Sequence, residues 1–424
     1  MTPGANEEFG GGSMAIGNFD NAADGAMKLA TGSFAGLLRM YFPREAGFRV
    51  EDVMLEQVLD APILQLAAGK FLSDSSRVTM AVLHPRMLAV YTISAVASQP
   101  NGKDASYYKV TMSYEHPLDR PACNFVHGPF GGTYGHELIC VQSMDGQLTV
   151  IEQDRILYER KLGRFLLPGP LTYCTKGDFF LTYASRMEVE CYKYATNVAG
   201  GAAAGAEGSG VARKLAPDWT LIVGEEVVSI QVGRFSRALA QSAVDILVVA
   251  AHTLVALKEN GTIRMQKRID YSPLCATSYP SGSSEPGAPE ENVLIGTQGG
   301  VILVYRDMEL LWSARLAHPA IALSVGDFGS VAGLIANLGH NGALALSYLG
   351  TDPPTSTIAT ETKELNYEAM DEEHRRLLQA SFDHPHTRQR CPCPCLAFSH
   401  DRFAPCFLSG DTRRIVGCQG GAYR

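Results

Sequence analysis

The stretch Leu138-Ile139-Cys140-Val141-Gln142-Ser143-Met144-Asp145-Gly146-Gln147-Leu148-Thr149-Val150-Ile151 decides the fold class of this chain. Two apolar runs flank the pair Asp145-Gly146, and this arrangement is typical of a β-hairpin. Asp-Gly pairs supply the positive φ angles of a two-residue turn between twisted strands, so the sequence predicts such a turn here. The same signal returns at Gln298-Gly299-Gly300 and at His340-Asn341-Gly342.

The hairpin belongs to a unit that recurs about every 50 residues. Each unit has an apolar strand that ends in Gly-x-Phe, a variable loop, two apolar runs joined by a tight turn, and a third short alternating run. The Gly-x-Phe elements are Gly17-Asn18-Phe19, Gly69-Lys70-Phe71, Gly128-Pro129-Phe130, Gly233-Arg234-Phe235 and Gly326-Asp327-Phe328. Two further hairpins, Phe179 to Tyr194 and Asn292 to Tyr305, have the same shape without a well-placed Gly-x-Phe. The sequence therefore predicts seven four-stranded units.

Seven such units predict an all-β fold, a seven-bladed β-propeller over residues 1–350 with four-stranded antiparallel blades. A parallel α/β fold would need helical patterns between the strands, and none occurs before residue 364. A β-sandwich would have far fewer than about 28 strands. After the propeller we expect a linker at 351–363, a short amphipathic helix at 364–382 with Asn366 as N-cap, and a disordered Cys/Pro-containing tail at 383–424.

The Gly-x-Phe elements are interpreted as structural. Glycine lets the innermost strand of a blade end close to its neighbours near the central channel, and the aromatic ring fills the space between adjacent blades. Repeated core positions seldom all contact one ligand, so this interpretation is favoured over a binding role.

The composition excludes some classes of function. With 36 basic and 44 acidic residues the net charge is -8, and the basic pairs are scattered, which argues against nucleic-acid binding. No apolar run approaches the roughly 20 residues of a membrane-spanning helix. The segment Met1 to Gly12 lacks the features of a signal peptide. We expect a soluble intracellular protein, with reduced thiols at Cys123, Cys140, Cys174, Cys191 and Cys275.

Motifs of catalysis are incomplete in this sequence. His136-Glu137 begins like a zinc-protease motif, but Cys140 replaces the second histidine and the segment starts a strand. Gly69-Lys70 has Leu64 where a phosphate loop has its first glycine, and the nucleophile elbow Gly-x-Ser-x-Gly is missing. The sequence therefore predicts no catalytic residue, cofactor or metal, and a protein that is not an enzyme.

Two further groups of residues are candidate sites. The tail carries Cys391-Pro392-Cys393-Pro394-Cys395, His400, Cys406 and Cys418, enough ligands for zinc, but alternating prolines differ from Cys-x-x-Cys knuckles. Disorder is therefore favoured over a metal site there. Three His-Pro pairs are expected at turns with the histidines as surface residues: His84-Pro85, His116-Pro117 and His318-Pro319.

Six segments in order carry a resemblance to a known family. They are Leu138 to Gly146, Phe165-Leu166-Leu167-Pro168-Gly169-Pro170-Leu171, Glu190-Cys191-Tyr192-Lys193-Tyr194, Asp218-Trp219-Thr220-Leu221, Ser347-Tyr348-Leu349-Gly350-Thr351-Asp352-Pro353 and Glu364-Leu365-Asn366-Tyr367-Glu368. Together they resemble the family of the ninth Bardet-Biedl syndrome protein, also called the parathyroid-hormone-responsive B1 protein. The resemblance extends over residues 14 to about 380.

This resemblance implies a non-enzymatic scaffold subunit of the BBSome, the coat-like adaptor complex that moves membrane proteins to and from cilia and flagella. The implied partners are other BBSome subunits and, indirectly, an Arf-like GTPase, the ciliary membrane and membrane-protein cargo. The implied locations are the cytoplasm, the cilium or flagellum, the basal body and, as part of a complex, the periphery of the ciliary membrane. Family members have further residues before the first unit and further domains after the propeller. We therefore expect a partial or mispredicted gene product.

Two other functions remain alternatives. A propeller enzyme or ligand-binding module with a site at the channel mouth would need polar residues that recur at equivalent loop ends. Only isolated ones occur, such as Asp20 and Asp327, and turn chemistry explains them. A WD-repeat interaction hub unrelated to cilia is disfavoured because the Gly-His and Trp-Asp pairs are missing.

Overall fold

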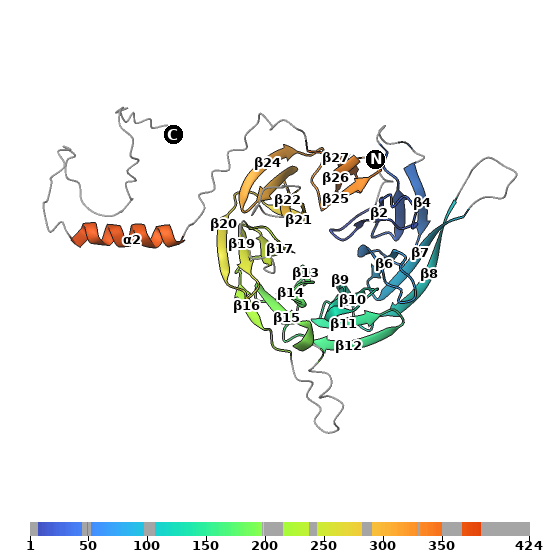
Figure 1. Ribbon diagram of the computed structural model, residues 1–424, viewed down its shortest axis with the longest axis horizontal. Helices are drawn as coiled ribbons and strands as arrows, with labels where there is room; N and C mark the ends of the chain where they lie inside the picture. Colours follow the sequence, from blue (N-terminus) through green and yellow to red (C-terminus); the bar gives the residue numbers. More distant parts are fainter. Residues whose placement is uncertain are drawn as a thin grey trace, which may run out of the picture. The chain divides into compact units, whose positions relative to one another are not determined.

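The computed structural model describes residues 7–44, 49, 52–96, 107–196, 198, 215–236, 244–281, 291–329, 331–349 and 367–382. The chain divides into two compact units, Met1–Asn366 and Tyr367–Arg424, which are described separately. In the first unit seven antiparallel sheets form a closed ring, with the first strand of each sheet innermost (Figure 1). The predicted seven-bladed β-propeller is thus confirmed.

The first three blades are four-stranded. Blade 1 contains β1 (Met14–Gly17), β2 (Lys28–Gly32), β3 (Leu37–Tyr41) and β4 (Val53–Val58). Blade 2 contains β5 (Gln65–Gly69), β6 (Thr79–His84), β7 (Met87–Val96) and β8 (Tyr107–Pro117). Blade 3 contains β9 (Ala122–Gly128), the 3-10 helix η2 (Phe130–Gly132), β10 (Leu138–Ser143), β11 (Gln147–Glu152) and β12 (Arg155–Lys161).

The remaining blades follow the same order. Blade 4 contains β13 (Leu171–Cys174), β14 (Phe179–Ala184), β15 (Glu188–Lys193) and β16 (Trp219–Ile222). Blade 5 contains β17 (Val227–Gly233), β18 (Asp245–Ala250), β19 (Thr253–Lys258) and β20 (Ile263–Arg268). Blade 6 contains β21 (Pro273–Pro280), β22 (Glu291–Thr297), β23 (Val301–Arg306) and β24 (Glu309–Arg315). Blade 7 contains β25 (Ala322–Phe328), β26 (Val331–Leu338) and β27 (Leu344–Ser347).

Blade 7 has three strands in the described part of the chain, whereas the other six blades have four. The ring still closes, because Phe328 and Ala336 of blade 7 share one buried cluster with Leu29 and Tyr41 of blade 1. At the turn between β26 and β27, the N–H of Phe9 donates to the carbonyl of His340 at 3.1 Å. Packing and this hydrogen bond therefore join the first and last blades.

The predicted two-residue turn at Asp145-Gly146 is wrong. Three residues, Met144 to Gly146, connect β10 to β11, and only Gly146 has a positive φ, of 82°. Its N–H donates to the carbonyl of Ser143 at 3.0 Å, while the Ser143 hydroxyl accepts the N–H of Gln147 at 3.0 Å. Because the serine side chain satisfies a backbone donor, the longer turn is stable with one glycine. Blades 1 and 6 repeat the turn, with Ser33 before Gly36 and Thr297 before Gly300.

The Gly-x-Phe elements occupy the expected places between blades. All five phenylalanines are buried: Phe19, Phe71, Phe130, Phe235 and Phe328. Each lies in a cluster that draws on two neighbouring blades. The glycines are needed for close approach, since a Cβ atom on Gly17 would lie 2.6 Å from that of Ala68 in blade 2. These residues therefore build the core that holds the blades together.

The second unit contains the helix α2 (Tyr367–Phe382), inside the predicted helical range 364–382. Leu377 and Leu378 are exposed on it. The predicted linker at 351–363, the N-cap Asn366 and the tail at 383–424 lie outside the described residues. Among the helices that the structure describes, none is long and apolar enough to cross a membrane.

Candidate protein-interaction surface

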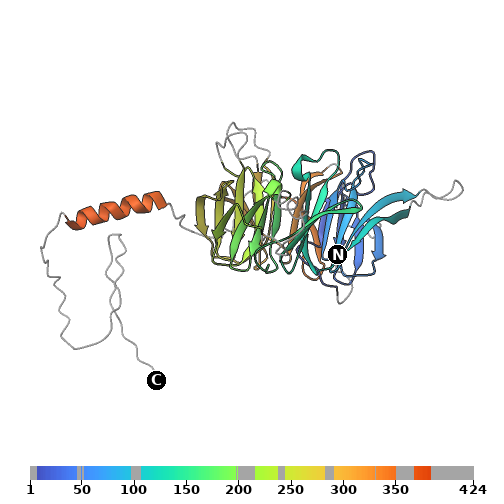
Figure 2. The same ribbon diagram turned by 90° about the horizontal axis from the view of Figure 1, so that it is seen from below.

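The loops of the ring fall on two faces, seen edge-on in Figure 2. Because strands alternate in direction, the loops after the first and third strands of each blade share one face. The turns between second and third strands and the blade-to-blade connections share the other, which we call the turn face. The Gly-x-Phe elements end the first strands and lie on the opposite face.

Four large apolar side chains are exposed on the turn face of blades 3 and 4. Phe165 is 71% exposed, Leu167 44%, Met187 41% and Ile222 73%. Phe165 and Leu167 flank Leu166, which is buried in the core between these blades. Burial of Leu166 turns both of its neighbours outward, as alternation in an extended segment requires. We call these four residues the apolar patch.

Backbone hydrogen bonds join the members of the apolar patch. The carbonyl of Phe165 accepts the N–H of Ser185 at 3.0 Å, in the turn that contains Met187. The carbonyl of Met187 in turn accepts the N–H groups of Val223 and Gly224, directly after Ile222. The blade connection, the turn and the end of β16 are therefore held together as one surface.

Met187 adopts an unfavourable backbone conformation. Its φ is 60°, in the left-handed region, at the turn position where blades 1, 3 and 6 have glycine. A side chain there costs on the order of 1 kcal/mol relative to glycine. Backbone strain of this kind is often found at functional positions, where the side chain is retained for its function despite the loss of stability.

Ion pairs flank the apolar patch. Arg164, next to Phe165, contacts the buried carboxylate of Glu188 and lies 3.8 Å from a carboxylate oxygen of Glu190. Glu190 also accepts a hydrogen bond of 2.7 Å from Tyr192, whose pKa is raised by burial. Exposed Arg186 lies between Ser185 and Met187. Exposed apolar side chains with a charged rim are the usual composition of a protein-binding surface.

His136 and Glu137 do not form a shared site. His136 pairs with Glu152 at 2.9 Å, whereas Glu137 pairs with His127 at 2.8 Å. Burial is the largest single influence and disfavours the charge on Glu137, but the hydrogen bond and charge interaction with His127, together with the backbone hydrogen bond and charge of Lys70, hold the pKa of Glu137 below its ordinary value. No cluster of three or more His, Cys, Asp or Glu suited to a metal occurs within the described residues.

Two of the His-Pro histidines are buried, so their expected surface position is wrong. His84 Nδ1 lies 2.8 Å from the carbonyl of Pro62, and His116 Nε2 lies 2.6 Å from that of Gln153. Each ring satisfies a carbonyl of a neighbouring loop, which proline-based turn rules do not reveal. His318 is half-buried.

The five cysteines of the propeller body are free. Cys140, Cys174 and Cys191 are buried, and Cys123 and Cys275 are partly buried. Burial raises the pKa of the Cys191 and Cys275 thiols to about 12. The cysteines of the tail lie outside the described residues.

A cavity of about 590 Å³ opens between blades 4 and 5. Two of its charged groups have partners: Asp218 accepts the backbone N–H of Lys193 at 2.8 Å, and Arg264 pairs with Asp307, outside the cavity lining, at 3.1 Å. None of its lining residues belongs to β13 or β17, the innermost strands of these blades.

Asp327, one of the isolated acidic residues at a loop end, accepts the N–H of Gly333 at 2.7 Å, as local turn chemistry predicts.

The fold defines a class, the seven-bladed β-propellers. The family described as PTHB1 N-terminal matches residues 1–353. Proteins named Protein PTHB1 from Xenopus laevis and Homo sapiens are each 38% identical over 384 residues, 88% of this chain. The chain belongs to the PTHB1 family, as its sequence predicted.

The alignment covers 44% of the Xenopus laevis protein and 42% of the human one, so the chain spans less than half the length of these relatives. A homologue from Caenorhabditis elegans is 23% identical over 319 residues. Among solved structures, BBS1N in complex with ARL6DN aligns with a TM-score of 0.56 over 82% of this chain and 95% of that chain. At 11% identity this similarity shows the propeller fold alone.

Proposed function

We propose that this chain is a non-enzymatic scaffold subunit of the BBSome, the coat-like adaptor that traffics membrane proteins to and from cilia and flagella. Membership of the PTHB1 family supports this role. The observation that carries the scaffold mechanism is the apolar patch on the turn face of blades 3 and 4. A rigid ring holds its four side chains in place before binding, which lowers the entropy cost of association.

The proposed direct partners are other BBSome subunits. Contact with an Arf-like GTPase, the ciliary membrane and membrane-protein cargo is proposed to be indirect, through the assembled complex. The fold shared with BBS1N, which was solved with ARL6DN, supports a propeller as a protein-binding element in this setting. The proposed locations are the cytoplasm, the basal body, the cilium or flagellum, and the periphery of the ciliary membrane.

Affinity purification of the tagged full chain from ciliated cells tests this function. We expect other BBSome subunits to be recovered with it at levels above a tag-only control. A thermal unfolding transition and a circular dichroism spectrum typical of β-sheet establish that the purified protein is folded. Recovery of folded protein without any BBSome subunit would contradict the proposal.

A further inference from the structure

A lysine ammonium group is buried in the loop between β1 and β2. Lys28, the first residue of β2, has a side chain that is 3% exposed. Its Nζ lies 2.6 Å from Oδ1 of Asp20 and 3.3 Å from Oδ1 of Asn18, with the ring centroid of Phe42 at 5.7 Å. An ammonium ion is a compact point charge, so two oxygens and an aromatic face surround it as they would a free cation.

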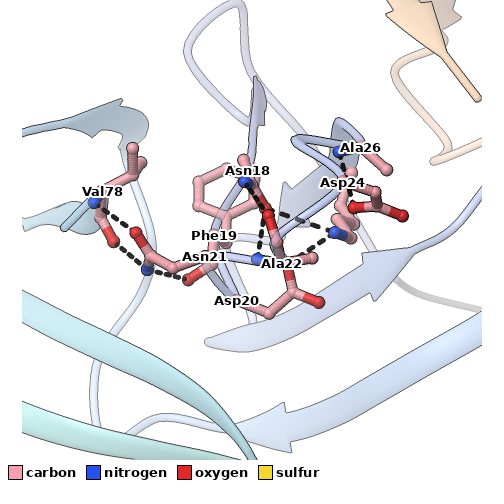
Figure 3. A network of polar contacts seen from close by, with 9 residues as sticks. Asn18, Phe19, Asp20, Asn21, Ala22, Asp24, Ala26 and Val78 are labelled. Carbon is pink, nitrogen blue, oxygen red and sulfur yellow. Dashed lines mark hydrogen bonds and ion pairs between the residues drawn. The ribbon is translucent and has the colours of Figure 1, made fainter.

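The same oxygens also shape the loop, and Figure 3 shows Asn18, Asp20 and Ala22 among its residues. Oδ1 of Asn18 accepts the N–H of Ala22 at 3.0 Å, and Nδ2 of Asn18 donates to the carbonyl of Ala22 at the same distance. Asp20 Oδ1 lies 3.4 Å from that N–H. The backbone thus wraps around the oxygen atoms that hold the ammonium. Amide and carboxylate oxygens two residues apart are also the ligand types that calcium prefers.

The shape of this loop fixes a contact between blades 1 and 2. Asn21, with a φ of 54°, donates from Nδ2 to the carbonyl of Val78 at 2.9 Å (Figure 3). Its Oδ1 accepts the N–H of Val78 at 2.7 Å. This pair of hydrogen bonds resembles one rung of a β-ladder made by a side chain. Asn21 makes both bonds from the left-handed backbone conformation, which asparagine tolerates in turns.

We propose that the loop of residues 18–28 is a cation site whose cation is the Lys28 ammonium, tethered to the chain in place of a divalent ion. The carboxylate of Asp20 offsets the cost of burying the charge. Because the cation is covalently attached, the loop and the Asn21–Val78 contact form without calcium. Removal of the ammonium should leave oxygens that bind Ca²⁺.

Substitution of Lys28 in the full chain tests this proposal. Lys28→Asp replaces the ammonium with a third oxygen donor group, and its thermal unfolding is followed in excess EDTA and in excess CaCl₂. We expect the melting temperature to fall by roughly 5 °C in EDTA, and calcium to restore most of the loss. The wild type should melt at the same temperature in both buffers. Isothermal titration with CaCl₂ should detect one site in the variant and none at this loop in the wild type.

Lys267→Asp is the matched control. Lys267 is also buried, its Nζ lies 5.5 Å from the ring centroid of Tyr305, and it donates to the carbonyl of Met308 at 2.9 Å. This control should lose stability without recovery in calcium. The proposal is overturned if calcium leaves Lys28→Asp as unstable as EDTA does, or if it stabilises the wild type or Lys267→Asp equally.

A second variant keeps the test decisive if Lys28→Asp does not fold in EDTA. Recovery of that variant only when calcium is present during expression and purification would support the proposal. If it is recovered in neither buffer, Lys28→Gln is measured in its place. A melting temperature of Lys28→Gln that does not depend on calcium would overturn the proposal.

Discussion

Phe328, at the end of the innermost strand of blade 7, and Leu29 of blade 1 belong to one buried apolar cluster, which joins the last blade of the ring to the first. Phe328→Ala should therefore lower the free energy of unfolding by about 3 to 5 kcal/mol, as truncation of a buried aromatic side chain does. Chemical denaturation followed by fluorescence measures this change. Phe165→Ala, at a 71% exposed position, should change stability by less than about 0.5 kcal/mol. Equal stability of the Phe328→Ala variant and the wild type would refute the assigned role.

Gly17→Ala should destabilise the contact between blades 1 and 2. The added Cβ would lie 2.6 Å from Cβ of Ala68, an atom fixed to the backbone of β5, so strands must shift to make room. We expect a loss of about 1 to 3 kcal/mol in the free energy of unfolding, the usual cost of overpacking. Gly163→Ala is the control, because its Cβ would meet only the carbonyl of Leu215 at 3.9 Å. A loss of the same size in both variants would show that glycine flexibility, rather than close approach, sets the cost.

Met187→Gly should separate stability from binding. Glycine relieves the left-handed backbone at a φ of 60°, so we expect the free energy of unfolding to rise by up to about 1 kcal/mol. The same change removes one apolar side chain from the patch and should reduce partner capture. Denaturation and affinity capture are measured on the same preparation. A variant that gains stability and still binds as well as the wild type would remove Met187 from the binding surface.

Glu137 should make the stability of the ring depend on acid pH. Burial opposes its ionisation, but the interactions with His127 and Lys70 together hold its pKa below the ordinary value of 4.5 in the folded protein. Its contribution to stability is therefore complete above the unfolded pKa and is lost as pH falls through the lower, folded pKa. Urea denaturation between about pH 6 and pH 3 should show a smaller loss of stability in Glu137→Gln than in the wild type. Glu226→Gln, at an exposed position, should follow the wild type.

The fold was predictable from the sequence because its signals are local and repeated. Gly-x-Phe ends the first strand in five of the seven blades, although the triplet also occurs elsewhere, at Gly32-Ser33-Phe34, Gly163-Arg164-Phe165 and Gly177-Asp178-Phe179. The turn at Asp145-Gly146 was predicted at the right place with the wrong length, since the Ser143 hydroxyl accepts a backbone N–H that dipeptide rules ignore. His84 and His116 were misplaced for a similar reason, because their carbonyl partners come from other loops.

The apolar patch was not predicted. Phe165 and Leu167 lie in a segment that carried the family resemblance, but their exposure depends on the burial of Leu166 between blades 3 and 4. Ile222 joins them only through the turn of blade 4, more than fifty residues along the chain from Phe165. The only signal in the sequence was the run of three apolar residues centred on Leu166, in which alternation turns the outer two toward solvent. That signal does not reveal which distant residues join Phe165 and Leu167 in the apolar patch.

Affinity capture with a double variant of the apolar patch tests the central claim most directly. The double variant Phe165→Asp/Ile222→Asp places charges at the two most exposed positions of the apolar patch. Val58→Asp is the control, because Val58 is 70% exposed and lies at the end of β4 on the same face of the ring. Captured BBSome subunits are quantified by mass spectrometry from folded proteins of equal melting temperature. We expect the double variant to capture at most about one tenth of the BBSome subunits that the wild type captures, because hot-spot side chains carry most of the binding energy of an interface. The Val58→Asp variant should capture as much as the wild type. Full retention by the double variant, or an equal loss in Val58→Asp, would contradict the assignment of the apolar patch as the binding surface.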